Sequence, residues 1–185
     1  QAEFEDAIFT YRELCRQEQK KELTFLSAGK DRFEQFSLDY YPDRLDPVMK
    51  VNVRALMERN LQMCRRYAAT FSEKSPNLLF SGDTGLGKTF LSACIARVVA
   101  DRGYSVVYES ASHLFGKLER AKFYNDEQAR QDSQRYTDCD LLIVDDLGTE
   151  MPSQFTTSAL YTLINDRILY GRPMILSTNL NTEGF

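Results

Sequence analysis

Four short, mostly apolar runs alternate with segments of helical periodicity in the chain after residue 77. The runs cover residues 78–80, 105–108, 141–144 and 174–176, and each is too short for a stable helix. Between them, apolar residues recur every three or four positions, as on one face of an amphipathic helix. Strands that alternate with helices predict an α/β fold in which helices flank one parallel sheet.

The first part of the chain has a different pattern. Over residues 4–26 a narrow apolar stripe follows helical spacing, which fits either a helix that docks on a partner or one that packs on its own domain. Residues 32–42 are rich in aromatic side chains without a clear period, and we expect an extended linker that lies against the core. We therefore divide the chain into an N-terminal helix with a linker, residues 1–45, and a core, residues 46–185.

Capping residues predict several helix boundaries. Asp46 and Pro47 supply an N-cap and a first helical residue for a long helix that runs to Phe71. The candidate N-caps of two later helices are Ser110 or Ser112, and Ser153.

A glycine-rich turn after the first run has the composition of a phosphate loop. It leads from the predicted strand into the next helix and has the sequence Gly82-Asp83-Thr84-Gly85-Leu86-Gly87-Lys88-Thr89. Glycines let the backbone turn its N–H groups toward phosphate oxygens, and the helix that follows adds its positive N-terminal end. Lys88 can reach the outer phosphates, and the Thr89 hydroxyl can ligate a magnesium ion that bridges them. We expect ATP or ADP to contact residues 82–90, of which Phe90 is the last.

Polar side chains end the third and fourth runs: Asp145 and Asp146 follow one, and Asn179 follows the other. The carboxyl ends of parallel strands meet at one edge of a sheet, so these groups should gather beside the phosphate loop. Asp145 is the candidate to hold the magnesium ion, and Asp146 the candidate to orient the attacking water. The simpler alternative is that both acids only end a strand.

Composition limits the class of protein. The 185 residues suffice for one main domain, and 23 basic against 27 acidic residues give a net charge of −4, so any contact with nucleic acid must be local. Four scattered cysteines and one histidine argue against a zinc site and favour reduced, packed thiols. The sequence has neither a membrane-length apolar segment nor a signal peptide pattern, so we expect a cytoplasmic protein without membrane contact.

Over residues 33–180 these motifs resemble the AAA+ ATPases of the DnaC/DnaI helicase-loader group, to which the transposition helper IstB is closely related. The resemblance includes the aromatic linker, the phosphate loop and both polar strand ends. It implies that residues 82–89 are Walker A, the two aspartates Walker B and Asn179 sensor 1, so that Lys88, Asp146 and Asn179 act in hydrolysis. It further implies an ATPase that assembles with ATP and loads a replicative helicase onto single-stranded DNA in DNA replication.

Two features limit the resemblance and leave alternatives open. Many AAA+ proteins end Walker B in Asp-Glu, whereas the second acid here is Asp146, so an adaptor that binds ATP and scarcely hydrolyses it is an alternative. The arginine finger and sensor 2 would lie beyond Phe185; of the nearby cations, we expect Arg167 to be a helix-surface charge and Arg172 a C-terminal cap. An IstB-like transposition helper would share the chemistry, and a small-molecule phosphotransferase would need an arginine-rich lid that is not evident.

Residues 112–124 are the candidate contact with single-stranded DNA. This segment holds the densest cations of the core, followed by two aromatic residues: Lys117, Arg120, Lys122, Phe123 and Tyr124. Cations can neutralise the DNA backbone while aromatic rings stack on bases. In the resembling loaders the segment after the second strand faces the pore of the assembly. The alternative is a solvated helix face with Phe123 in the core.

Overall fold

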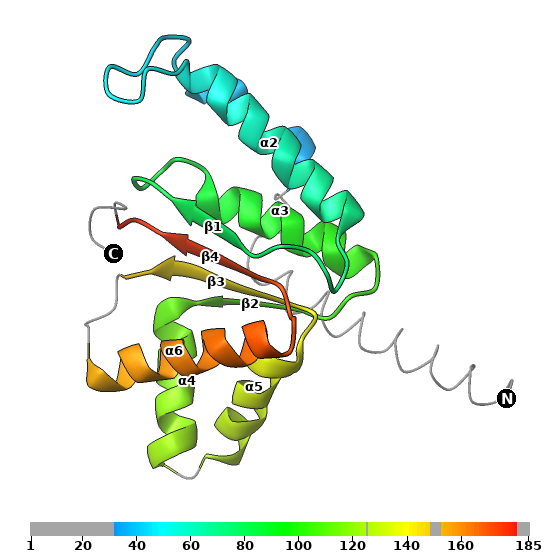
Figure 1. Cartoon of the computed structure of the whole chain (residues 1–185), viewed down its shortest axis with the longest axis vertical. Helices are drawn as coiled ribbons and strands as arrows, with labels where there is room; N and C mark the ends of the chain where they lie inside the picture. Colours follow the sequence, from blue (N-terminus) through cyan, green and yellow to red (C-terminus); the bar gives the residue numbers. More distant parts are fainter. Residues whose placement is uncertain (1–31, 125, 149–152, 181–185) are drawn as a thin grey trace, which may run out of the picture.

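A four-stranded parallel sheet separates two layers of helices (Figure 1). The computed structural model describes residues 32–124, 126–148 and 153–180. The strands lie in the order β1-β4-β3-β2, with the bounds β1 Leu78–Ser81, β2 Val106–Ser110, β3 Leu141–Leu147 and β4 Met174–Thr178. One face is covered by α2 (Val53–Thr70) and α3 (Lys88–Asp101), the other by α4 (Ala111–Phe123), α5 (Glu127–Asp138) and α6 (Gln154–Leu169). The predicted α/β fold is confirmed.

Side chains of the two central strands, β3 and β4, alternate between the helical layers. Leu141, Ile143 and Ile175 pack with α2 and α3, whereas Leu142 and Met174 pack with α4, α5 and α6. Burial on both faces explains why these strands are continuous apolar runs in the sequence.

The aromatic linker lies against the α2–α3 layer, as predicted. It contains two short 3-10 helices, η1 (Phe33–Gln35) and η2 (Leu38–Tyr40), and is therefore less extended than expected. Phe33 and Tyr41 are buried in the same hydrophobic cluster as α2 and α3. The helix predicted over residues 4–26 lies outside the described residues, and the domain boundary after residue 45 stays a prediction.

The long helix α2 begins at Val53, so the predicted start at Pro47 is wrong. The Asp46 carboxylate does accept hydrogen bonds from two backbone N–H groups, at 2.8 and 2.7 Å, but it caps only a single turn. Lys50 ends that turn with a φ of 55°, a left-handed conformation that cannot continue a right-handed helix. Asn52 is the N-cap of α2 instead.

Two predicted N-caps and three predicted packed thiols are confirmed. Ser110 caps α4, and Ser153 caps α6 with a reciprocal pair of hydrogen bonds. Cys64, Cys94 and Cys139 are buried and not paired in disulfides. Within the part of the chain that the structure describes, no helix has both the length and the apolar character of a membrane span.

Arg167 is buried, so the prediction of a surface charge is wrong. Its guanidinium donates to the carbonyl oxygens of Tyr136, Cys139 and Pro173 at 2.7, 3.1 and 2.6 Å. Tyr136 and Cys139 lie at the C-terminal end of α5, where carbonyl groups lack partners within the helix and a cation is favoured. Arg167 on α6 therefore ties the end of α5 to the residue before β4.

Arg167→Met should lower the free energy of unfolding by about 3 kcal/mol or more, because several buried carbonyl groups lose their donor at about 1–3 kcal/mol each. Arg130→Met is the matched control, since Arg130 is an exposed residue of α5 and such a change stays within about 0.5 kcal/mol. Urea unfolding measures both variants. Equal stability of the two would mean that the buried hydrogen bonds of Arg167 add nothing net.

Candidate nucleotide site

The glycine-rich loop connects β1 to the first turn of α3. Gly82, Gly85 and Gly87 have φ values of 138°, 84° and 87°, which residues with a side chain rarely adopt. A Cβ atom at Gly87 would also lie 2.8 Å from the Tyr41 hydroxyl oxygen and 3.1 Å from the Phe36 ring. The loop needs glycine both for its curvature and for the close approach of the aromatic linker.

Two aromatic residues of the linker contact the glycine-rich loop. The Tyr41 hydroxyl donates to the Leu86 carbonyl at 3.0 Å, and its ring stacks on Phe36 with centroids 5.6 Å apart. The ring of Phe90 packs on Phe36 in turn, at 5.8 Å. The sequence predicts that the linker lies against the core but not that it contacts the loop; the density of aromatic residues is the signal that points to this contact.

The Lys88 ammonium lies within the loop that precedes it. It donates to the carbonyl oxygens of Gly82 and Asp83 at 2.7 and 2.8 Å, and to Asn179 Oδ1 at 2.8 Å. Asn179 directly follows β4, the strand that pairs with β1. Lys88 therefore joins the phosphate loop to the end of the neighbouring strand.

Asp145 lies two residues after Ile143 on β3 and points toward the same helical layer, that of α3. It is 7% exposed. The Tyr108 hydroxyl from β2 donates to its Oδ2 at 2.7 Å, and the Ser177 hydroxyl from β4 donates to its Oδ1. A buried carboxylate needs such donors, and here both neighbouring strands supply one.

Asp145 and Asp146 both lie within a β-bulge. Between Val144 and Leu147, β3 carries one more residue than β4. Asp146 has a left-handed backbone with φ 61°, and Leu147 packs in the α4–α6 layer as Val144 does. Regular alternation would turn Asp146 toward that apolar layer, whereas the bulge leaves its side chain exposed at the end of the strand.

Asp146 and Asn179 are in direct contact. Asn179 Nδ2 donates to Asp146 Oδ1 at 2.6 Å, while the Asp146 N–H donates to the Ser177 hydroxyl at 2.9 Å. Because Asn179 Oδ1 accepts from Lys88, a single amide connects the lysine to the second aspartate. The structure thus brings together the three motif ends that sequence analysis expected at one edge of the sheet.

The oxygen groups at this edge fit a magnesium ion bound with a nucleotide. The Thr89 residue is exposed in the first turn of α3, and its hydroxyl and the Asp145 carboxylate are ligands of the type that Mg²⁺ prefers. The sequence patterns do not predict that Tyr108 and Ser177 are partners of Asp145. Ser177 lay in the polar tip of the fourth run, but only the pairing of β2 with β3 reveals Tyr108.

Comparison with known proteins agrees with this arrangement. Residues 51–185 match the family model described as IstB-like ATP binding protein. The chain belongs to this family. A putative ATP-binding protein of insertion sequence IS232 from Bacillus thuringiensis subsp. berliner is 32% identical over 115 residues, which cover 62% of this chain and 45% of that protein. The replicative helicase loader DnaC of Escherichia coli K12 is 27% identical over 126 residues, 66% of this chain and 50% of DnaC.

The IstB-like chain spans about half the length of these curated relatives. Among solved structures, AMPPCP-bound DnaA from Aquifex aeolicus superposes with a TM-score of 0.63 at 19% identity, covering 84% of this chain and 44% of that one. That likeness is one of fold. The chain is thus a member of the IstB-like ATP-binding family, with a fold like that of DnaA.

Lys88→Ala in the IstB-like chain should weaken ATP binding about tenfold or more, because a hydrogen bond to a charged group contributes about 1.5–3 kcal/mol. The fold should persist, since the partners of Lys88 among the described residues lie in the loop and at Asn179. Titration with a fluorescent ATP analogue measures the affinity, and Lys74→Ala, an exposed lysine before β1, is the matched control. Normal nucleotide binding by folded Lys88→Ala protein would contradict the phosphate-loop assignment.

Proposed function

We propose that this protein is an AAA+ ATPase that binds and hydrolyses MgATP at the candidate nucleotide site. The observation that carries the proposal is the hydrogen-bonded connection from Lys88 through Asn179 to Asp146. In a glycine-rich turn that matched the motif by chance, we would not expect the lysine to be connected by hydrogen bonds to the ends of β4 and β3. Membership of the IstB-like ATP-binding family supports the nucleotide.

Each group has one task in this proposal. Lys88 neutralises charge on the outer phosphates, while backbone N–H groups of residues 82–90 face phosphate oxygens. Thr89 and Asp145 hold Mg²⁺, which offsets charge on the phosphates when it is bound. Asp146 orients the attacking water, and Asn179 keeps that carboxylate in position through its amide hydrogen bond.

We assign the ATPase a role in DNA replication as a helicase loader, supported by the similarity to DnaC. The full-length protein would assemble with ATP in the cytoplasm and place a replicative helicase on single-stranded DNA. An IstB-like transposition helper is the second candidate, supported by the family match and by the insertion-sequence relative. Purifying the full-length protein from its native cell and identifying its partner, helicase or transposase, distinguishes the two.

We assign the contact with single-stranded DNA to the exposed end of α4 and exclude Lys117 from it. The ammonium of Lys117 lies 2.8 Å from Glu109 and 3.4 Å from Asp132. Burial alone would lower the pKa of Lys117, but the hydrogen bond and charge of Glu109, together with Asp132, raise it. This lysine is therefore charged and forms ion pairs with two carboxylates of the protein.

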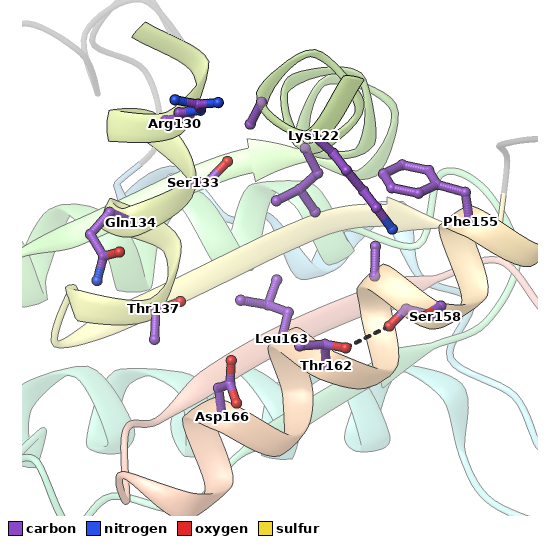
Figure 2. A pocket seen from close by; sticks show the side chains of 13 residues that line it. Lys122, Arg130, Ser133, Gln134, Thr137, Phe155, Ser158, Thr162, Leu163 and Asp166 are labelled. Atoms are coloured by element: carbon purple, nitrogen blue, oxygen red, sulfur yellow. Dashed lines mark hydrogen bonds between the residues drawn. The ribbon is translucent and has the colours of Figure 1, made fainter. Parts of the chain in front are cut away.

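The cations and rings that remain on this segment lie at the exposed end of α4: Arg120, Lys122, Phe123 and Tyr124. Phe123 is 60% and Tyr124 72% exposed, so the alternative in which Phe123 packs in the core is wrong. The Lys122 ammonium lies 5.4 and 5.3 Å from the ring centroids of Phe123 and Phe155. Figure 2 shows Lys122 and Phe155 at one end of a groove of about 510 Å³ between α4, α5 and α6. Cations beside exposed rings suit a single strand.

Asp146→Asn should leave ATP affinity unchanged and slow turnover about tenfold or more, because the amide cannot accept a proton from the attacking water as a carboxylate does. Asparagine tolerates the left-handed backbone as aspartate does, so the bulge is retained. Phosphate release by the full-length protein with single-stranded DNA measures turnover. An unchanged rate would remove Asp146 from the mechanism, and a wild-type protein that binds ATP without turnover would favour the adaptor.

Tyr124→Ala should weaken single-stranded DNA binding about tenfold while ATP affinity stays the same, since stacking contributes about 1–3 kcal/mol per base. Tyr170→Ala is the matched control, because Tyr170 is 65% exposed and follows the C-terminal end of α6. Fluorescence anisotropy with a labelled oligonucleotide and the ATP-bound full-length assembly gives both affinities. Equal loss in the two variants, or none in either, would rule out the assignment to α4.

A further inference from the structure

We propose that Tyr108 and Ser177 are positioning residues for Asp145, and that their hydroxyl groups set the affinity of the nucleotide site for Mg²⁺. This inference rests on the proposed function, in which Asp145 holds the metal ion. It concerns two residues to which the sequence motifs of the site assign no role.

The geometry around Asp145 assigns one donor to each carboxylate oxygen. Tyr108 on β2 donates to Oδ2 at 2.7 Å, and Ser177 on β4 donates to Oδ1. The donors come from strands on opposite sides of β3, so the two hydrogen bonds together fix the orientation of the carboxylate. An ionised carboxylate accepts at about four positions, so it keeps acceptor positions for a metal ion or its water.

Ser177 makes a second hydrogen bond that links the two aspartates. Its oxygen accepts from the Asp146 N–H at 2.9 Å, at the bulge where β3 departs from regular pairing with β4. The same hydroxyl donates its proton to Asp145. The position of Asp145 is thereby tied to the backbone of Asp146, and Ser177, only 1% exposed, holds both from the neighbouring strand.

Tyr108 has the length that its position requires. It pairs with Ile143, two residues before Asp145, so its side chain must extend along the sheet to reach the carboxylate. The hydroxyl also lies 3.5 Å from the Thr89 carbonyl oxygen. Tyr108 therefore stands between the two residues that hold Mg²⁺ in the proposed function, one on α3 and one on β3.

A purely structural role would be to satisfy a buried carboxylate, and it has a different consequence. Loss of a structural hydrogen bond lowers stability whether or not Mg²⁺ is present. Loss of a positioning hydrogen bond lowers the affinity of the site for the metal ion, since residues that bond to metal ligands typically contribute about 10- to 100-fold to that affinity. The dependence of nucleotide binding on Mg²⁺ concentration distinguishes the two roles.

The test uses Tyr108→Phe, which removes the hydroxyl and keeps the ring. A fluorescent ATP analogue is titrated at a series of Mg²⁺ concentrations and in EDTA, and thermal unfolding without ligand confirms that each variant is folded. We expect the Mg²⁺ concentration for half-maximal binding to rise about tenfold, with affinity in EDTA equal to that of the wild type. Tyr104→Phe is the matched control, because Tyr104 precedes β2 and so lies near the amino ends of the strands, whereas Asp145 lies near their carboxyl ends.

Ser177→Ala, measured in the same way, keeps the inference testable if one variant does not fold. A rise in the Mg²⁺ midpoint for either folded variant, absent in Tyr104→Phe, supports it. Midpoints equal to that of a Mg²⁺-dependent wild type overturn this inference alone, including when thermal stability falls. Wild-type binding that does not respond to Mg²⁺ overturns the proposed metal site, and the inference with it.

Discussion

The one-residue bulge in β3 decides how the carboxyl edge of the sheet is built. In a regular strand, consecutive acids would face opposite layers, and Asp146 would enter the apolar layer that holds Val144, where an unpaired carboxylate is costly. The bulge instead leaves Asp145 held between two strands and Asp146 exposed beside Asn179. Aspartate adopts the left-handed backbone more readily than longer acids, so an Asp-Asp ending agrees with this geometry better than Asp-Glu.

Strand β2 connects that edge to the opposite helical layer. Its consecutive residues Tyr108 and Glu109 point to the two faces of the sheet, as strand geometry requires. Tyr108 bonds to Asp145 on the α3 side, while Glu109 bonds to Lys117 of α4 and Tyr136 of α5 on the other. The helix assigned to DNA contact, α4, and the acid assigned to magnesium are thus attached to neighbouring positions of one strand, which agrees with the proposed function.

The aromatic linker makes the phosphate loop depend on a segment outside the family match, which begins at residue 51. Tyr41 bonds to the loop and Phe36 packs beside Gly87 and Phe90. A glycine-rich loop has high conformational freedom before it binds phosphate. Contacts from the linker restrict that freedom in the second half of the loop, around Leu86 and Gly87.

Periodicity and short motifs are local properties of the chain, so the alternation of strands and helices, the phosphate loop and the polar strand ends could be predicted from the amino-acid sequence. Tertiary structure alone decided the burial of Arg167, the pairing of Lys117 and the donors of Asp145. The partners of Arg167 and Asp145 include groups more than about thirty positions away in the sequence. Lys117 pairs with Asp132 on the next helix, α5. The start of α2 was also predicted wrongly, since an aspartate such as Asp46 caps a single turn as readily as a helix. The left-handed conformation of Lys50 shows that Asp46 caps a single turn here. Strand order and register bring such groups together, and no local pattern encodes them.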